Sequence, residues 1–360
     1  MNNKMFIGEI AVVVAGILFA GLHNCGTIKI KKQGVFAAGG ENIVHSGKYN
    51  NKYFAGWGEQ KEDGQSYHAN HAIVDYQIPA HANKYPLIFV HGFGGSGTSW
   101  TMTPDGRDGF ATLMLKHKYP TYVMDLPGRG QAGRTTNTTT IKPNANEMFW
   151  FDIWRFGEYP NWNDGVQAVK SDDYFRGIFV QMTPDLSNGS ADVPAISATV
   201  DKVGDSVLVT HSAGGVTGWL AAMANDNVRG VASYEPGGFV FPDDDLPAAI
   251  DGKTGGTAPI PVPREQFMKL TQIPIVMYFG DYIPTDVKAI SDKLGAENWR
   301  VRLAMAHTFC DAINTNGGNC SVIELPKIGI YGNTHFLMQD LNNDKLADLL
   351  NKWLRKNKLK

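Results

Sequence analysis

The sequence is poor in several features that would define its class. It has three cysteines among 360 residues, Cys25, Cys310 and Cys320, which excludes a scaffold built on many disulfides. Charged residues make up 19% of the chain and the formal net charge is −2, with no lysine or arginine run before the last few residues. This balance gives no support for a nucleic-acid partner. Hydrophobic residues make up 43%, so we expect a sizeable packed core.

Two of the three cysteines could form one disulfide bond. Cys310 and Cys320 enclose the segment C-D-A-I-N-T-N-G-G-N-C. This spacing, across a helix end and a Gly-Gly turn, could close a disulfide in an oxidising compartment. Two unpaired buried thiols are the alternative, because a sequence does not show how far apart the two Cα atoms lie.

The one long apolar run lies at the N-terminus. After M-N-N-K the chain reads M-F-I-G-E-I-A-V-V-V-A-G-I-L-F-A-G-L, in which Glu9 is the only charged residue. A short positive start followed by an apolar stretch that ends in small residues predicts a secretory signal within residues 1–26, cleaved between Ala20 and about Gly26. We therefore expect an exported protein, periplasmic or secreted. An uncleaved membrane anchor is the alternative, because the run is just long enough to span a bilayer.

The rest of the chain, 27–360, has the pattern of an α/β domain. Two alternating segments, 27–36 and 71–79, predict an antiparallel entry to a sheet. Short, continuously apolar runs predict buried parallel strands at 86–90, 119–125, 206–210, 230–234, 273–279 and 321–325. Helical patterns occur at 213–224, 285–294, 298–315 and 344–356. Strands that alternate with helices favour a mostly parallel central sheet with helices on both faces.

Two connections are too long to be simple loops. The first contains the aromatic-rich segment F-W-F-D-I-W-R-F-G-E-Y-P-N-W, and the second is rich in proline, glycine and aspartate. Long insertions in a compact domain are usually lids or binding loops. We interpret them as cap insertions at about 135–190 and 236–270, over the sheet edge where open α/β sheets bind ligands.

Ser212 lies where one buried strand stops. In T-H-S-A-G it follows the strand directly and opens a helix, and the small residues beside it let strand and helix approach closely. The pattern is that of a nucleophile elbow, G-x-S-x-G, with Thr210 in place of the first glycine. The alternative, Ser212 as an ordinary helix N-cap, explains the serine but not the run Ala213-Gly214-Gly215.

A glycine-rich turn follows the strand at 86–90. It reads H-G-F-G-G-S-G and would let backbone N–H groups converge beside a nucleophile, as the oxyanion of an acyl-transfer intermediate requires. We assign these donors to Phe93 and Ala213, with Gly94 as the substitute for Phe93. The turn also has the form G-x-G-x-x-G, but a lone match of this kind is weak evidence for a phosphate site.

A serine nucleophile needs a base and an acid that orients the base. Only His307 and His335 follow both the elbow and the later strands, and His307 lies within a helical pattern. His335 lies in a Gly/Asn loop before the last helix, so we select it. His211, next to the serine, is interpreted as structural.

Two acids satisfy the chain order from serine through acid to histidine. Glu235 ends the strand after the elbow helix, in S-Y-E-P-G-G. Asp281 ends the next strand, in Y-F-G-D. The residues alone leave both open.

Together these motifs resemble the α/β-hydrolase superfamily over roughly residues 65–355. S-Y-E-P-G-G and G-N-T-H-F-L-M-Q-D-L-N-N are similar to an esterase subgroup whose acid is a glutamate after the sixth strand. The resemblance implies an α/β-hydrolase fold, a triad of Ser212, Glu235 and His335, and oxyanion donors at Phe93 and Ala213. Asp281, at the superfamily's more usual acid position, becomes the reserve.

The function implied is hydrolysis of a small-molecule carboxylic ester through an acyl-enzyme, which needs no metal and no organic cofactor. The same triad serves thioesterases, peptidases and acyltransferases, and fold alone does not separate them. From another class, an exported homologue that only binds a ligand is the alternative. The sequence indicates no oligomeric state, and a membrane enters only through an uncleaved N-terminal segment.

Overall fold

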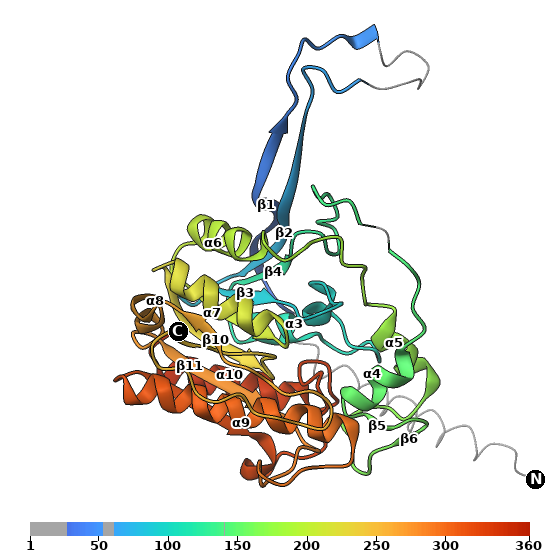
Figure 1. Ribbon diagram of the computed structural model, residues 1–360, viewed down its shortest axis with the longest axis vertical. Coiled ribbons are helices and arrows are strands. Elements are labelled where there is room, and N and C mark those ends of the chain that lie inside the picture. Colours follow the sequence, from blue (N-terminus) through green and yellow to red (C-terminus); the bar gives the residue numbers. More distant parts are fainter. Residues whose placement is uncertain (1–26, 53–60, 140) are drawn as a thin grey trace, which may run out of the picture.

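The computed structural model of the protein describes residues 27–52, 61–139 and 141–360 (Figure 1). The expected signal or anchor at 1–26, together with Cys25, lies outside these residues. Within the described ranges, no helix has both the length and the apolar character needed to cross a membrane.

A central sheet of eight strands organises the fold. In order across the sheet these are β1 (Ile30–Val44), β2 (Ser66–Pro79), β4 (Thr121–Asp125), β3 (Leu87–Val90), β7 (Ser206–His211), β8 (Val228–Tyr234), β11 (Pro274–Phe279) and β12 (Asn319–Glu324). β1 pairs antiparallel with β2, and β2 with β4, whereas every later pair is parallel. The predicted α/β-hydrolase fold, a mostly parallel sheet with an antiparallel entry, is confirmed.

The two sheet faces bury two separate cores, because successive strand side chains point to opposite faces. Leu87 and Phe89 of β3 belong to one core, and Ile88 and Val90 belong to the other. The first core is covered by α3 (Phe110–Lys116) and α10 (Asn343–Lys356). The second is covered by α6 (Asp192–Val203), α7 (Gly214–Ala224), α8 (Arg264–Leu270) and α9 (Leu294–Thr315). Burying each large apolar side chain contributes about 1.5–3 kcal/mol, so an apolar run with no polar face is stable only in such a sandwich.

The first long connection folds beside the carboxyl ends of the strands (Figure 1). It contains α4 (Glu147–Ile153), β5 (Gly157–Glu158), β6 (Asn161–Trp162) and α5 (Asp172–Phe179). Phe151 packs edge to face against Trp162 and Phe175, and Trp154 stacks on Phe179. Its buried aromatic residues therefore extend the first core of the sheet, to which Phe151 and Trp154 belong.

The second long connection contains a two-stranded parallel sheet of β9 (Val240–Pro242) and β10 (Ile260–Val262), followed by α8. Phe239, Phe241 and Phe267 pack around Phe309 of α9. This segment lies against the helices on one face of the sheet. Two short helical segments complete the described elements, α2 (Thr98–Thr101) and the 3-10 helix η2 (Leu325–Ile328).

The helix expected at 285–294 is wrong. Residues 285–293 form bends and turns, and α9 begins at Leu294. The buried pair Glu297 and Arg300 takes up the backbone groups of this segment: Ser291 N–H donates to Glu297 Oε2 at 2.9 Å, and Arg300 Nη1 donates to Val287 O at 2.6 Å. These tertiary bonds replace the bonds that a helix would make.

Cys310 of α9 and Cys320 of β12 are free, buried thiols. The disulfide considered from their spacing is not formed, and the alternative of two unpaired thiols is what the structure contains. Hydrogen bonding to Cys320 lowers the pKa of Cys310, while burial raises the pKa of Cys320.

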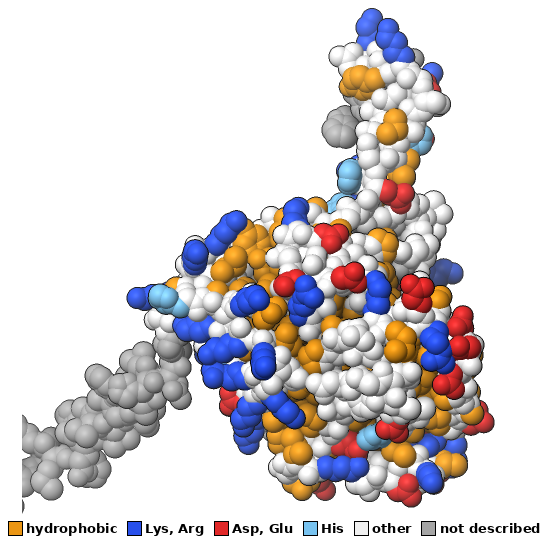
Figure 2. All heavy atoms as spheres, turned by 90° about the vertical axis from the view of Figure 1, so that its left-hand side faces the viewer, with side chains coloured by type: hydrophobic (Ala, Val, Ile, Leu, Met, Phe, Trp, Pro, Cys, Tyr) orange, Lys and Arg blue, Asp and Glu red, His pale blue; other side chains and the backbone are white. Residues whose placement is uncertain are grey.

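The outer half of the β1–β2 hairpin stands away from the body as an arm, here residues 41–52 and 61–69 (Figure 1). Apolar side chains lie along it and basic side chains at its outer end (Figure 2). Val44 is 68% exposed and Tyr49 is 53% exposed, so the arm adds little to either core.

Candidate active site

Ser212 lies at a sharp turn between β7 and α7, with φ at +53°. A residue with a Cβ is strained in this left-handed region, typically by about 1–3 kcal/mol, so the surrounding packing must hold it. Two glycines after the serine allow this close packing. A Cβ on Gly214 would lie 2.5 Å from His91 O, and a Cβ on Gly215 would lie 2.5 Å from Pro236 Cβ. The small residues after the serine therefore let the elbow pack between the ends of the neighbouring strands.

Thr210, the departure from the usual elbow pattern, is accommodated by its neighbours. A Cβ on Gly218 of α7 would lie 2.7 Å from Thr210 Cγ2, so the glycine provides the space that the branched side chain occupies. The Thr210 hydroxyl donates to Ser233 Oγ of β8 at 2.7 Å. Gly218 of the facing helix thus makes room for the Thr210 side chain, and the turn at Ser212 keeps its shape.

Glu235 is buried at the end of β8, with φ at +46°. His335 Nδ1 lies 2.6 Å from Glu235 Oε2. The other carboxylate oxygen, Oε1, accepts the Gly280 N–H at 2.7 Å and the Nη2 group of Arg155. Burial raises the pKa of Glu235, and the Arg155 charge acts against that shift. Both oxygens are therefore fully engaged, one with the imidazole and one with the groups that hold the carboxylate.

The loop that carries His335 is fixed by a buried polar network. His335 N–H donates to Trp154 O at 3.0 Å. The Asp340 carboxylate accepts from Asn333 Nδ2 at 2.9 Å, and from both the N–H and the hydroxyl of Thr334 at 2.8 Å. Burial raises the pKa of Asp340 to about 7. The motif G-N-T-H…D-L-N-N is thus a self-contained loop that aims the imidazole.

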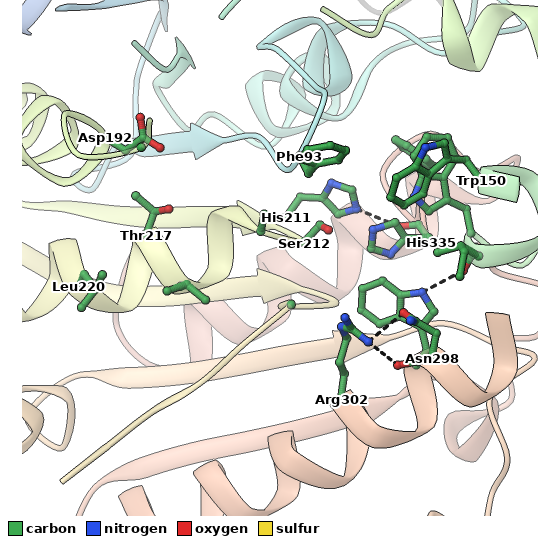
Figure 3. A pocket seen from close by; sticks show the side chains of 18 of the residues that line it. Phe93, Trp150, Asp192, His211, Ser212, Thr217, Leu220, Asn298, Arg302 and His335 are labelled. Atoms are coloured by element: carbon green, nitrogen blue, oxygen red, sulfur yellow. Dashed lines mark hydrogen bonds between the residues drawn. The ribbon is translucent and has the colours of Figure 1, made fainter. Parts of the chain in front are cut away.

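Ser212 and His335 line the same cavity, whose volume is about 610 Å³. Figure 3 shows the Ser212 hydroxyl pointing toward the His335 ring. Ser212 Oγ has no hydrogen-bond partner among the described residues, and His335 Nε2 is free to accept because Nδ1 is engaged by Glu235. Catalytic hydrogen bonds are often loose before substrate binds and tighten in the complex.

The two expected oxyanion donors also lie at this cavity. The N–H groups of Phe93 and Ala213 donate to no acceptor within the part of the chain that the structure describes. The turn that carries Phe93 lies directly beside Ser212, because a Cβ on Gly92 would be 2.8 Å from Ser212 Cβ. Gly94, the substitute donor, sits on the same turn with φ at +67°.

Asp281 and His307, the other candidate acid and base, bind other partners. The Asp281 carboxylate accepts the N–H groups of Tyr282 and Gly332, each at 2.7 Å, and has no contact with His335. His307 pairs with Glu324 at 2.9 Å, away from the cavity.

His211, interpreted from sequence as structural, is buried against His335. Its Nε2 lies 3.0 Å from His335 O, and the two ring centroids are 4.5 Å apart. Burial lowers the pKa of His211, so the ring stays neutral.

Sequence reasoning missed three residues of the site. Arg155 reaches Glu235 from the first insertion, and its Nε also donates to Asp281 O at 2.8 Å. The Trp299 ring packs on His335 with centroids 4.2 Å apart, and Arg302 lies one helical turn further along α9 at the cavity wall. A lone arginine in the aromatic run 149–162 was a signal for Arg155, whereas nothing in the helical pattern marks the other two.

Comparison with known proteins gives three findings. Residues 87–341 match the model of a family described as the alpha/beta hydrolase family. A protein named probable secreted lipase phiG, from Fungal sp. (strain ATCC 74256), is 26% identical over 316 residues, which cover 79% of this chain and 85% of that protein. A solved structure described as a novel bacterial esterase is 28% identical, with a TM-score of 0.72, and the match covers 92% of this chain and 98% of that one.

Proposed function

The chain belongs to the alpha/beta hydrolase family, and from that premise we propose that it is a serine carboxylic-ester hydrolase with a Ser212-Glu235-His335 triad. Its similarity to a lipase and an esterase supports a hydrolase. One observation carries the finer assignment. His335 Nδ1 lies 2.6 Å from the buried carboxylate of Glu235, and its ring borders the cavity into which the strained elbow presents Ser212.

The geometry supports a two-step acyl transfer. His335 Nε2 takes the proton of Ser212 Oγ as the oxygen attacks the ester carbonyl, and the Phe93 and Ala213 N–H groups hold the oxyanion. The protonated imidazole, stabilised by Glu235, then gives its proton to the departing alcohol. Water, deprotonated by the same nitrogen, releases the acid from Ser212. Every catalytic group in these steps belongs to the chain, and the ester and the water are the reactants.

The cavity supports a small-molecule ester as substrate. Its walls are largely aromatic and aliphatic, from Phe93, Trp150, Trp154, Val216 and Leu220. Phe93 and Trp150 are in ring contact at 5.6 Å, so the first insertion touches the oxyanion turn and forms part of the cavity wall. We propose that this insertion sets the acyl length that fits.

We also propose that the enzyme is exported. The apolar run within 1–26 supports this, as does similarity to a protein named a probable secreted lipase.

A covalent probe tests the proposed function. An alkyl fluorophosphonate should inactivate the enzyme with first-order kinetics, and peptide mass spectrometry should place one adduct on Ser212. A series of 4-nitrophenyl esters of rising acyl length should be hydrolysed until the chain exceeds the cavity. Modification of a residue outside the cavity, or no turnover of any ester, would refute the proposal and favour a protein that only binds its ligand.

Arg155 should control the pH dependence of the reaction. Replacing it with methionine is expected to move the acid limb of kcat/KM to higher pH, for two reasons of the same sign. Without the guanidinium the pKa of Glu235 rises further, and the pKa of His335, which Arg155 lowers, also rises. The first change keeps Glu235 neutral, and the second keeps His335 protonated, over more of the acidic pH range. The kcat/KM profile from pH 4 to 9 for a 4-nitrophenyl ester measures the shift.

The matched control for this prediction is Arg155→Lys, which keeps the charge and should shift the limb less. Leaving Glu235 without its partner should also reduce the free energy of unfolding by about 3–5 kcal/mol, measured by urea titration. A folded Arg155→Met enzyme with an unchanged acid limb would contradict the role given to Arg155.

A further inference from the structure

Arg302 is a charged residue at the cavity wall with no charged partner in the described part of the chain. Arg155 pairs with Glu235, and Arg300 with Glu297. In contrast, no carboxylate lies within 4.0 Å of Arg302 across 27–52, 61–139 and 141–360, and burial is the cause that lowers its pKa. The Arg302 guanidinium is therefore partly desolvated at the cavity that Ser212 also lines, and no described residue supplies an anion to it.

The Arg302 side chain is held in place but is not saturated. Its Nη1 donates to the backbone oxygen of Asn298 at 2.6 Å and to Asn298 Oδ1 at 2.8 Å. Its Nε and Nη2 donate to no described residue, and neither does Asn298 Nδ2. Figure 3 shows both side chains rising from α9 toward the cavity, below Ser212 and His335. A fork of unused donors therefore faces the space where a substrate would lie.

Trp299 fixes the position of this fork relative to the reacting groups. The Arg302 guanidinium lies 5.4 Å from the Trp299 ring centroid, and the same ring packs on His335 at 4.2 Å. Burial lowers the pKa of His335, and the charges of Arg155 and then Arg302 lower it further. The unpaired charge is therefore part of the reaction centre and not of the outer surface.

We propose that Arg302, with Asn298, is a subsite for a carboxylate of the substrate, so that the preferred esters carry a free carboxylate a few atoms from the scissile carbonyl. This rests on the proposed function. A planar guanidinium with two parallel N–H groups matches a carboxylate in shape and charge, and the bond is strong where water is partly excluded. The substrate carboxylate supplies the counter-ion that Arg302 lacks among the described residues.

The position of a second charged group sets the orientation of such a substrate. Asp192 lines another part of the cavity, near Thr217 and Leu220 (Figure 3). Its Oδ1 is buried and has no hydrogen-bond partner among the residues that the structure describes, and burial raises its pKa to about 6. At neutral pH this carboxylate repels an anion, so the charged end of the ester lies at Arg302 and the uncharged end extends toward Leu220.

Two matched pairs of esters test the proposal and separate the two sides of the ester. On the acyl side, the mono-4-nitrophenyl ester of adipic acid is compared with 4-nitrophenyl hexanoate. On the alcohol side, 3-acetoxybenzoate is compared with phenyl acetate. In at least one pair the carboxylated ester should have the higher kcat/KM, by roughly 10- to 100-fold, mostly through KM. Equal or lower kcat/KM for the carboxylated ester in both pairs would overturn the proposal.

Substitution then places the preference at Arg302. The ratio of kcat/KM within the preferred pair should fall to about 1 in Arg302→Gln, fall only partly in Arg302→Lys, and stay unchanged in Arg176→Gln. Arg176 lies on α5 with 72% of its side chain exposed. Its replacement by glutamine removes the same charge outside the cavity. Using a ratio cancels any general loss of activity. A preference that survives in Arg302→Gln would refute the assignment.

A binding measurement keeps this result separate from the proposed function. Calorimetric titration of Ser212→Ala protein with 3-acetoxybenzoate and with monomethyl adipate should give tighter binding of at least one of them than of its neutral counterpart, phenyl acetate or methyl hexanoate. Adding Arg302→Gln should remove the difference. Absent turnover with this binding pattern would reject the esterase and keep the carboxylate subsite, whereas turnover without charge discrimination would reject the subsite alone.

Discussion

Replacing Ser212 with alanine is expected to reduce kcat for a 4-nitrophenyl ester by about 10⁶-fold, because the oxygen that forms the acyl-enzyme is gone. The Phe93 and Ala213 N–H groups would remain, so a small residual rate above that of water is expected. Alanine at φ +53° carries the same backbone strain as serine. The fold and the unfolding temperature should therefore change little. Stopped-flow and long-time absorbance assays at 400 nm together cover the range of rates.

Ser190→Ala is the matched control for Ser212→Ala. Ser190 is exposed and follows Asn188 and Gly189, which line the cavity, but is not itself a lining residue. Its removal should leave kcat within a factor of about 2, as expected for a surface change away from the reacting groups. If Ser212→Ala retained the wild-type rate, the hydrolysis would have to come from another nucleophile, and the triad would be wrong.

The sheet was predictable because its signal is local. A continuously apolar run of strand length is stable only between two helical layers, and each such run corresponds to a strand of the eight-stranded sheet. The segment 285–294 shows the limit of this reasoning. Its spacing fits a helix, yet the buried Glu297–Arg300 pair claims its backbone groups, and that pair is not visible in the segment itself.

The candidate site divides in the same way. Ser212, Glu235 and His335 each lie in a short motif whose glycines and polar residues shape a turn, so their positions at strand ends could be inferred. Arg155 and Arg302 lie in an aromatic run and a regular helix, and only the fold brings Arg155 to Glu235 and Arg302 to the cavity. Contacts of this kind form only in the folded protein, and the spacing of residues along the sequence carries little information about them.

Thr210 shows why a motif departure need not disrupt the geometry it encodes. The glycine that the elbow lacks on the strand is present on the facing helix as Gly218, at the atom where the extra methyl group would clash. A pattern written along one segment cannot describe a fit shared by two. Close packing constrains the combined volume of the two side chains and not the residue type at either position alone.

The identity of the acid gives the second large effect. Glu235→Gln is expected to reduce kcat by about 10⁴-fold, because an amide no longer stabilises the imidazolium and can favour the wrong tautomer of His335. Asp281→Asn should change kcat by less than about 10-fold, since that carboxylate only accepts the Tyr282 and Gly332 N–H groups. Side-by-side kcat measurements at the wild-type pH optimum compare the two.

Folding must be separated from chemistry in this comparison, because Glu235→Gln leaves the Arg155 charge buried without its partner. That should reduce the free energy of unfolding by about 3–5 kcal/mol. The double variant Glu235→Gln/Arg155→Met removes both charges and should regain part of the stability without regaining activity. Recovered stability with kcat still near the Glu235→Gln level would assign the loss to the missing carboxylate. A greater loss of kcat in Asp281→Asn than in Glu235→Gln would instead move the role of the acid to Asp281, and the short contact between Glu235 and His335 would then be structural.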